Sequence, residues 1–191
     1  MSLRDHPPGS YGTVTRLFHW VTAGIVVIQI PVGIAMTSEA APDIGDFLFI
    51  LHKGMGSVFL PFVVARLIWK FMHPVSPLLP TTPPLQRRIA ALTHGLLYVL
   101  LVALPITGYV RTVGDGYPIE LLDAIGIPPL VTGIPETAHL MLVIHKFSAY
   151  LLTAVIAAHL GAAVHHGMIE RDGVMSRIWP PVRARGSRIS D

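Results

Sequence analysis

Histidine is the residue type in this chain that can carry chemistry. The sequence contains ten histidines and no cysteine. Because cysteine is absent, structural disulfides, iron–sulfur clusters and the covalent C-x-x-C-H attachment of c-type haem are excluded. A neutral imidazole, in contrast, binds transition metals and haem iron through a ring nitrogen. The chemistry open to this chain is therefore metal or haem binding by histidine.

The spacing of four histidines favours two separate haem centres. His145 and His159 are fourteen residues apart, which is about four helical turns, so their rings share one helix face about 21 Å apart along the axis. That distance is too long for one metal centre. His52 lies at the same predicted depth as His145, on the outer side. His19 lies at the depth of His159, on the inner side, so we predict two stacked haems b, each held non-covalently between one histidine pair.

Further polar residues lie near the same depths. Arg66 comes fourteen residues after His52, which brings its guanidinium to the depth of the inner pair, where we predict that it binds a haem propionate. His94 is an alternative ligand, or a residue near a quinone. His165 and His166 lie near the end of the last predicted helix, where a position at the membrane interface, or one lining a proton or quinone route, is favoured over haem ligation. The roles of these three histidines stay open.

The composition indicates that lipid is the solvent of this protein. Apolar residues make up 52% of the chain and charged residues only 13%, which is outside the range of an ordinary soluble domain. The formal net charge of +3 comes from basic residues placed where membrane topology responds to them. We therefore do not expect nucleic acid as a partner.

Four apolar segments are long enough to span a membrane as helices, which takes roughly 20 residues each. They lack the alternation of barrel strands, so we predict an all-α, integral membrane four-helix bundle that forms one domain over residues 1–191. Prolines inside the segments are tolerated in membrane helices. The four predicted helices are residues 17–37, 47–71, 89–110 and 137–167, and a tail follows at residues 168–191.

The connections between these helices indicate the orientation. A proline-rich linker at 73–84 separates two helical hairpins, and an apolar stretch at 119–127 predicts a short interfacial helix. Only three of the fourteen basic residues lie away from the termini and the proline-rich linker. The positive-inside rule therefore predicts a bacterial inner-membrane protein with both termini in the cytoplasm.

Several motifs together resemble the bacterial cytochrome b561 family, of the small di-haem inner-membrane type. The likeness covers residues 11–179 and consists of RLFHW, LHKGMG, VARL, HGLLYVLLVALPITG, and two histidines separated by thirteen residues and followed by His165 and His166. The resemblance implies a four-helix di-haem fold in which the four paired histidines match the ligand positions. It also implies oxidation of superoxide at the periplasmic face and reduction of ubiquinone, although the wider superfamily includes cytochrome b subunits of hydrogenases and dehydrogenases.

Three basic residues on the outer side favour an anionic electron donor. Lys53 and Lys146 are immediate neighbours of the outer ligands, and Arg111 follows the third helix. These charges can focus superoxide onto the outer haem. The alternative is that the lysines extend toward the headgroups or pair with haem propionates. Membrane lipid, ubiquinone, and superoxide or another periplasmic donor are the expected partners, and a homodimer is left open.

Two other functions remain as alternatives. The first is a cytochrome b subunit that passes electrons between the quinone pool and a periplasmic dehydrogenase or hydrogenase. The second is a histidine-lined transporter for a divalent metal. The absence of intramembrane carboxylates beside the histidines argues against the transporter, because such cations usually recruit carboxylate ligands as well.

Overall fold

The computed structural model describes residues 11–38, 44–74 and 82–179, and the described part contains helices joined by turns and loops, without strands. Four helices are long and apolar enough to cross a membrane. This confirms the predicted all-α membrane fold, with each helix beginning two to five residues before the predicted start. The four helices are α1 (Thr13–Ala35), α2 (Gly45–Met72), α3 (Pro84–Gly114) and α5 (Pro135–Val164).

The surface of the four helices is the surface of a lipid-solvated protein. In the most apolar 18-residue stretch of each helix, no more than 22% of the residues are buried inside the molecule. Large apolar side chains such as Leu92 and Phe71 are 74% and 76% exposed. Pro31, Pro61 and Pro105 lie within continuous helices, as the sequence predicts. Because water would penalise so much exposed apolar surface, these helices require hydrocarbon around them.

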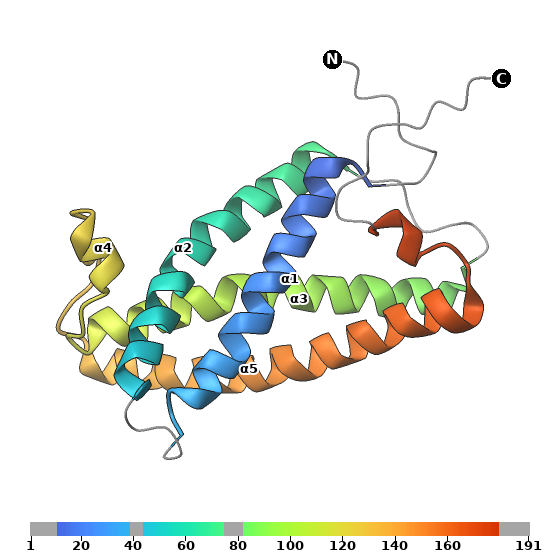
Figure 1. Ribbon diagram of the computed structural model, residues 1–191. Helices are drawn as coiled ribbons and strands as arrows, with labels where there is room; N and C mark the ends of the chain where they lie inside the picture. The colour runs from blue at the N-terminus through green and yellow to red at the C-terminus, as the bar shows by residue number, and fades with distance from the viewer. Residues whose placement is uncertain (1–10, 39–43, 75–81, 180–191) are drawn as a thin grey trace.

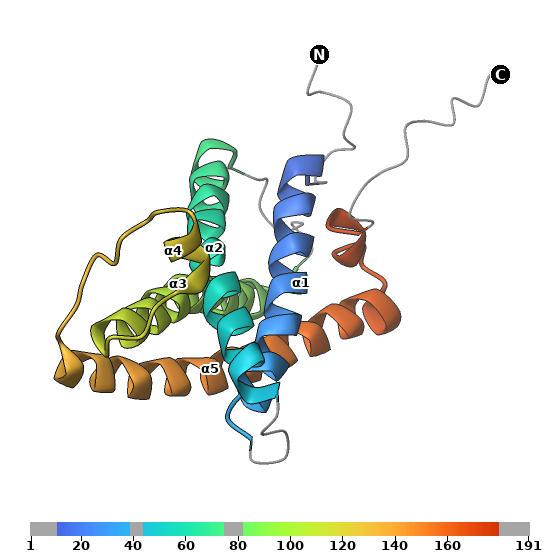
Figure 2. The same ribbon diagram turned by 60° about the vertical axis from the view of Figure 1, so that its left-hand side comes forward.

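The helices form two antiparallel hairpins that cross each other (Figures 1 and 2). Helices α3 and α5 lie side by side along most of their length, and α1 and α2 pass over them. The buried core lies where the hairpins cross and contains side chains from all four helices. Its buried members are Val26, Phe59, Val63, Leu100, Leu101 and Leu152.

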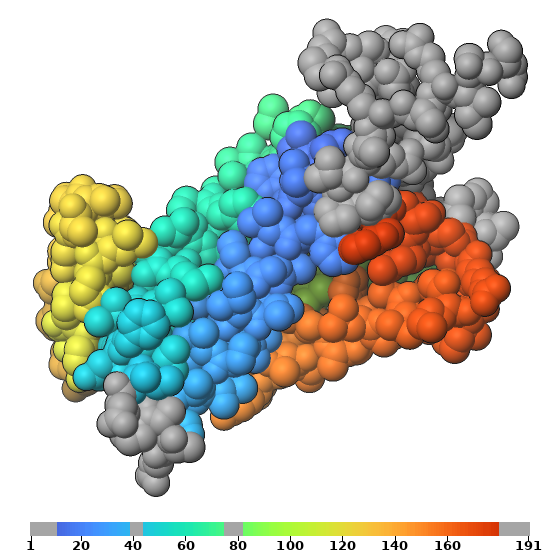
Figure 3. All heavy atoms as spheres, viewed as in Figure 1, coloured from blue at the N-terminus to red at the C-terminus, as the bar shows by residue number. Residues whose placement is uncertain are grey.

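Two short segments lie at opposite ends of the bundle (Figures 1 and 3). Helix α4 (Glu120–Ala124) lies next to α2 and corresponds to the short helix predicted at 119–127. At the other end, α5 passes into the π-helix η2 (His165–Glu170), and the 3₁₀ turn η3 (Met175–Arg177) follows. The indole of Trp20 donates a hydrogen bond to the carbonyl of Ile178 at 3.1 Å. The first part of the predicted tail therefore folds back onto α1, while residues 180–191 lie outside the described residues.

Candidate haem sites

The residues of interest repeat at intervals of seven along each long helix. This interval is two helical turns, or about 10 Å, so it defines three layers across the bundle. The outer layer contains Gly33, His52, Gly108 and His145. The middle layer contains Val26, Phe59, Leu101 and Leu152, all members of the buried core. The inner layer contains His19, Arg66, His94 and His159.

The outer layer brings His52 and His145 together as predicted. Their ring centroids are 6.2 Å apart and the rings are nearly perpendicular, at 84°. Two imidazoles that bind one metal from opposite sides, each through a bond of about 2 Å, have ring centres about 6 Å apart. Nδ1 of His52 is buried and has no hydrogen-bond partner among the described residues. The separation fits a haem iron held between the two rings.

Two glycines leave the space that these rings occupy. A Cβ atom added to Gly33 would lie 3.1 Å from Cε1 of His52, and a Cβ added to Gly108 would lie 3.0 Å from Cε1 of His145. Real side chains at these positions would therefore push the imidazoles away. His52 on α2 packs against Gly33 on α1, and His145 on α5 packs against Gly108 on α3. The two hairpins therefore hold their outer histidines in the same way.

Hydrogen bonds determine which nitrogen of His145 can bind iron. Its Nδ1 lies 2.9 Å from the carbonyl oxygen of Leu104 and 3.1 Å from Oγ1 of Thr107. A carbonyl oxygen only accepts, so Nδ1 carries the hydrogen and Nε2 keeps its lone pair. A hydrogen bond of this kind orients the ring of a metal-binding histidine and raises its basicity. On the other histidine of this pair, the side chain of Gln29 donates to the backbone carbonyl of His52 at 2.9 Å.

The inner layer brings His19 and His159 to the same separation. Their ring centroids are 6.4 Å apart, with 59° between the ring planes. His94 lies closer to His159, at 5.3 Å, and its ring contacts that of His159 edge-on. This distance is that of a direct ring contact and is shorter than the spacing of two imidazoles across a metal. The geometry therefore favours His19 over His94 as the partner of His159.

Arg66 lies in the inner layer, at the depth that its spacing predicts. Its guanidinium donates to the carbonyl of Phe18, the neighbour of His19, at 3.1 Å, and lies over the ring of Tyr98 at 5.3 Å. The charge is thus held beside the inner histidine pair. Binding of a propionate by Arg66 remains a prediction.

Comparison with known proteins adds a second line of evidence to this geometry. The profile of the prokaryotic cytochrome b561 family matches residues 10–181. The chain belongs to this family. It is therefore an electron-transfer protein of the membrane, and the family implies b-type haem as its cofactor. Membership also favours haem over a transported metal as the partner of the histidines.

Individual relatives match over most of their length. Cytochrome b561 homolog 1 of Escherichia coli (strain K12) is 30% identical over 166 residues, which are 85% of this chain and 92% of the relative. Cytochrome b561 homolog 2 of the same organism is 27% identical over 179 residues, or 90% and 92% of the two chains. A protein of Yersinia pestis named "Probable superoxide oxidase CybB" is 24% identical over 165 residues, or 86% and 93%.

The three basic residues predicted to focus an anionic donor have different surroundings. The ammonium of Lys53 is buried and donates to the carbonyl of Pro118 and to Oε1 of Glu120, each at 2.7 Å. Burial acts to raise the pKa of Glu120, but the hydrogen bond and charge of Lys53 outweigh it, so this pKa lies below its ordinary value. Arg111 pairs with Asp115 at 3.4 Å. Lys146 is exposed and has no ion pair within the part of the chain that the structure describes.

Several functional residues were not identified from the sequence. Gly33, Gly108, Thr107 and Gln29 all support the outer pair. A signal for two of the missed residues exists. Gly33 follows His19 by fourteen residues, and Gly108 follows His94 by the same interval, so each lies at the depth of the outer pair.

Proposed function

We propose that this chain binds two haems b, one above the other, and passes electrons from superoxide at the periplasmic face to ubiquinone in the membrane. The observation that carries the proposal is the presence of two histidine pairs at the same separation, 6.2 and 6.4 Å, in two layers of one bundle. When bound there, haem supplies reversible one-electron chemistry of its iron.

The residues of the chain divide the work between the layers. His52 and His145 would hold the iron of the outer haem, and His19 and His159 that of the inner haem. Arg66 would neutralise a propionate beside the inner pair. The middle layer consists of apolar side chains, which keep water out of the space between the two levels and lower the dielectric response there.

The choice of donor has two supports. The relative from Yersinia pestis carries the name of a probable superoxide oxidase, and Lys146, beside the outer ligand His145, presents an exposed positive charge. Arg111 adds a second charge, although Asp115 offsets it. The charge of Lys53 is offset by Glu120, so we assign the attraction of an anionic donor chiefly to Lys146 and give Lys53 a share only when Glu120 is protonated.

The proposed reaction balances with two superoxide anions for each quinone. Each superoxide loses one electron and leaves as dioxygen. Ubiquinone takes up two electrons and two protons and becomes ubiquinol. The orientation predicted by the basic residues places the inner pair toward the cytoplasm, so the protons would enter from that side.

Purified holoprotein tests the two parts of this proposal separately. Its reduced-minus-oxidised spectrum and haem-to-protein ratio should show two haems b per chain, and His145→Ala and His159→Ala should each lose one of them. His139→Ala, an exposed histidine of the same helix, serves as the control. A colourless protein, or full haem content in both variants, would overturn the haem assignment.

Rapid mixing with superoxide and a soluble ubiquinone tests the donor and the acceptor. We expect ubiquinone-dependent loss of superoxide, slowed by Lys146→Glu and by raised ionic strength while haem content is unchanged. Haem reduction that requires a co-purified dehydrogenase, with no response to superoxide, would instead identify a cytochrome b subunit of a larger complex.

A further inference from the structure

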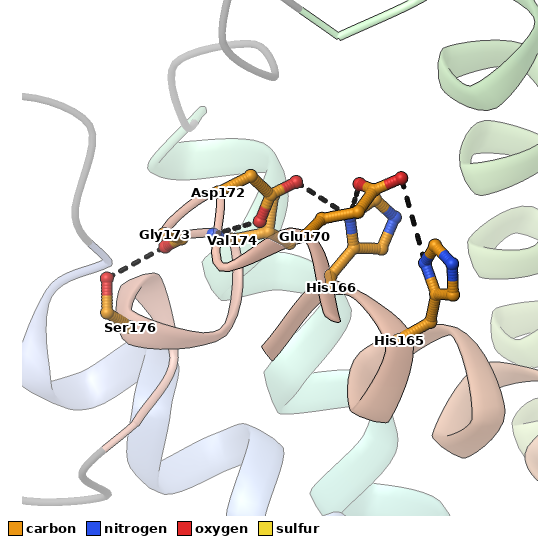
Figure 4. Close-up of polar contacts among 7 residues, drawn as sticks. All are labelled: His165, His166, Glu170, Asp172, Gly173, Val174 and Ser176. Carbon is orange, nitrogen blue, oxygen red and sulfur yellow. Dashed lines mark hydrogen bonds and ion pairs between the residues drawn. The ribbon is translucent and has the colours of Figure 1, made fainter. Parts of the chain in front are cut away.

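A cluster of histidines and carboxylates lies where the last membrane helix ends. Helix α5 passes into the π-helix η2 at His165, and the chain then turns back toward η3. Figure 4 shows the side chains of His165, His166, Glu170 and Asp172 converging in this turn. The cluster lies outside both haem layers, because His166 is two helical turns beyond His159.

Three of these residues bring possible metal-binding atoms close together. Nδ1 of His166 lies 2.6 Å from Oδ2 of Asp172 and 2.8 Å from Oε2 of Glu170. All three ligand atoms lie within 4.8 Å of one another. His165 contributes a fourth nitrogen, 3.7 Å from Oε1 of Glu170. The side chains of His166, Glu170 and Asp172 are only 20%, 32% and 28% exposed.

The backbone around the cluster positions these groups before any ligand binds. Arg171 adopts the left-handed conformation, with φ of 51°, which is uncommon for a residue other than glycine. This turn brings Asp172 back over His166. The second carboxylate oxygen of Asp172 accepts a hydrogen bond from the backbone N–H of Val174 at 3.0 Å.

The cluster has more acceptors than it has hydrogens to share. Nδ1 of His166 carries at most one hydrogen, which cannot point at both carboxylates, and each carboxylate accepts only. Two negative charges therefore face a single imidazole nitrogen. A cation that accepts electron pairs from all three atoms would satisfy them together, which one shared hydrogen cannot do.

We propose that His166, Glu170 and Asp172 form a binding site for a divalent transition metal of the Zn²⁺ class, with His165 available as a fourth ligand. An imidazole combined with carboxylates is a zinc-type ligand set, whereas Mg²⁺ and Ca²⁺ prefer oxygen atoms alone. Zinc bonds of about 2.0–2.2 Å in tetrahedral geometry place ligand atoms a little over 3 Å apart. From 2.6 and 2.8 Å, Nδ1 of His166 would need to move away from the two carboxylate oxygens by roughly 0.5–1 Å to admit the ion.

Metal binding would tie the end of α5 to the segment that contacts α1 beside His19. The chain leaves Asp172 toward η3, and this segment contacts α1 through the hydrogen bond of Trp20 to Ile178 and a ring contact between Trp20 and Trp179 at 5.1 Å. Trp20 is the neighbour of His19. The bound metal would therefore hold the C-terminal segment against α1, next to His19.

Equilibrium dialysis of the purified holoprotein against Zn²⁺, read by elemental analysis, tests the site without an activity assay. We expect one Zn²⁺ per chain in addition to the haem iron. His166→Ala and Asp172→Asn should each weaken binding at least about tenfold, because even loss of an outer-shell partner of a metal ligand costs 10- to 100-fold. The matched control is His139→Ala combined with Glu136→Gln, an exposed histidine and carboxylate at the opposite end of α5.

Two results would overturn the site: wild-type protein that binds no Zn²⁺ at micromolar concentration, or wild-type affinity in both site variants. If His166→Ala fails to fold, the conservative Asp172→Asn decides. Zn²⁺ should also slow amide hydrogen exchange across residues 172–178 in the wild type and leave it unchanged in Asp172→Asn. Equal exchange with and without Zn²⁺ in the wild type would contradict the proposal that the metal holds the C-terminal segment in place. Haem content reports separately on the proposed function, because none of these residues lies in the haem layers.

Discussion

At the scale of single residues, the outer histidines depend on the absence of side chains opposite them. A methyl group at Gly33 or Gly108 would approach an imidazole carbon to 3.1 or 3.0 Å. Relief of such crowding forces side chains off their preferred rotamers and typically costs about 1–3 kcal/mol. The displaced ring would also lose its alignment with the iron, so the loss should appear in haem content before it appears in the fold.

Gly33→Ala and Gly108→Ala should therefore each lower the haem content from two per chain toward one. The measurement is the haem-to-protein ratio of the purified variants, with a redox titration to show that the remaining haem is the inner one. Gly24→Ala and Gly95→Ala are matched controls, because a Cβ at either position meets nothing within 4 Å. Equal haem content in all four variants would show that the glycines do not position the ligands.

The hydroxyl of Thr107 provides a second test at this scale. It lies 3.1 Å from Nδ1 of His145, where it helps the carbonyl of Leu104 to orient the ring. Thr107→Val keeps the shape of the side chain and removes this contact, so we expect about 10- to 100-fold faster transfer of the outer haem to an acceptor apoprotein. Thr153→Val is the control, because Thr153 is exposed and bonds only its own helix, to the carbonyl of Ala149 at 2.8 Å. The same transfer rate in both variants would contradict the assigned role.

At the scale of the helices and loops, one ion pair attaches α4 to α2. The side chain of Lys53 is 6% exposed and that of Glu120 is 43% exposed, so the carboxylate screens a charge that would otherwise be buried alone. Loss of a partner that leaves a buried polar group unsatisfied costs about 1–3 kcal/mol. The pair on its own is worth less, because water screens the exposed carboxylate.

Glu120→Gln should loosen the connection between α3 and α5. We expect faster amide hydrogen exchange across residues 115–134 with no change in haem content, whereas Asp123→Asn, an exposed acidic residue of the same short helix, should leave exchange unchanged. The pKa of Glu120 is lower in the folded protein than in the unfolded chain. The carboxylate therefore stabilises the folded protein fully at pH values above the pKa of an unpaired glutamate, and this stabilisation is lost as the pH falls through the lowered pKa. Exchange that does not depend on this carboxylate would indicate that apolar contacts alone hold α4.

At the scale of the whole molecule, the number of spans and the distribution of charge determine the topology. Four spans would place Tyr11 and Arg177, near the two ends of the described residues, on the same side of the membrane, and the N–H of Tyr11 hydrogen-bonds the carbonyl of Arg177 at 3.2 Å. Eleven of the fourteen basic residues belong to the termini, the proline-rich linker and the helix ends near them. The positive-inside rule therefore predicts that this side is the cytoplasm.

Fusion reporters can check this orientation. A green fluorescent protein at the C-terminus should fluoresce, because it folds in the cytoplasm, and alkaline phosphatase inserted after Gly126 should be active, because it requires the periplasm. Gly126 is exposed and the other fusion is at the end of the chain, so both fusions should leave the haem layers intact. An active phosphatase at the C-terminus, or an inactive one after Gly126, would reverse the orientation and with it the assignment of outer and inner haems.

The amino-acid sequence alone was sufficient for the properties that depend on distance along a helix. The rise per residue is the same in every α-helix, so the intervals between His145 and His159 and between His52 and Arg66 already predicted two levels in the bundle. Hydropathy likewise predicted four spans and the short helix α4, because lipid allows an uninterrupted helix as the form of such a segment. These predictions are local and need no knowledge of the neighbouring helices.

Only the tertiary structure decided which side chains face one another. No interval within one helix determines how the hairpins cross and rotate. This arrangement placed Gly33 against His52 and Gly108 against His145. It also brought His19 to the distance of a second ligand from His159 and left His94 in direct contact with His159. The same holds for Lys53, whose charge is offset by Glu120 from another segment, and for Asp172, which reaches His166 through one left-handed residue. Contacts between segments arise from packing, and packing depends on all of the surfaces at once.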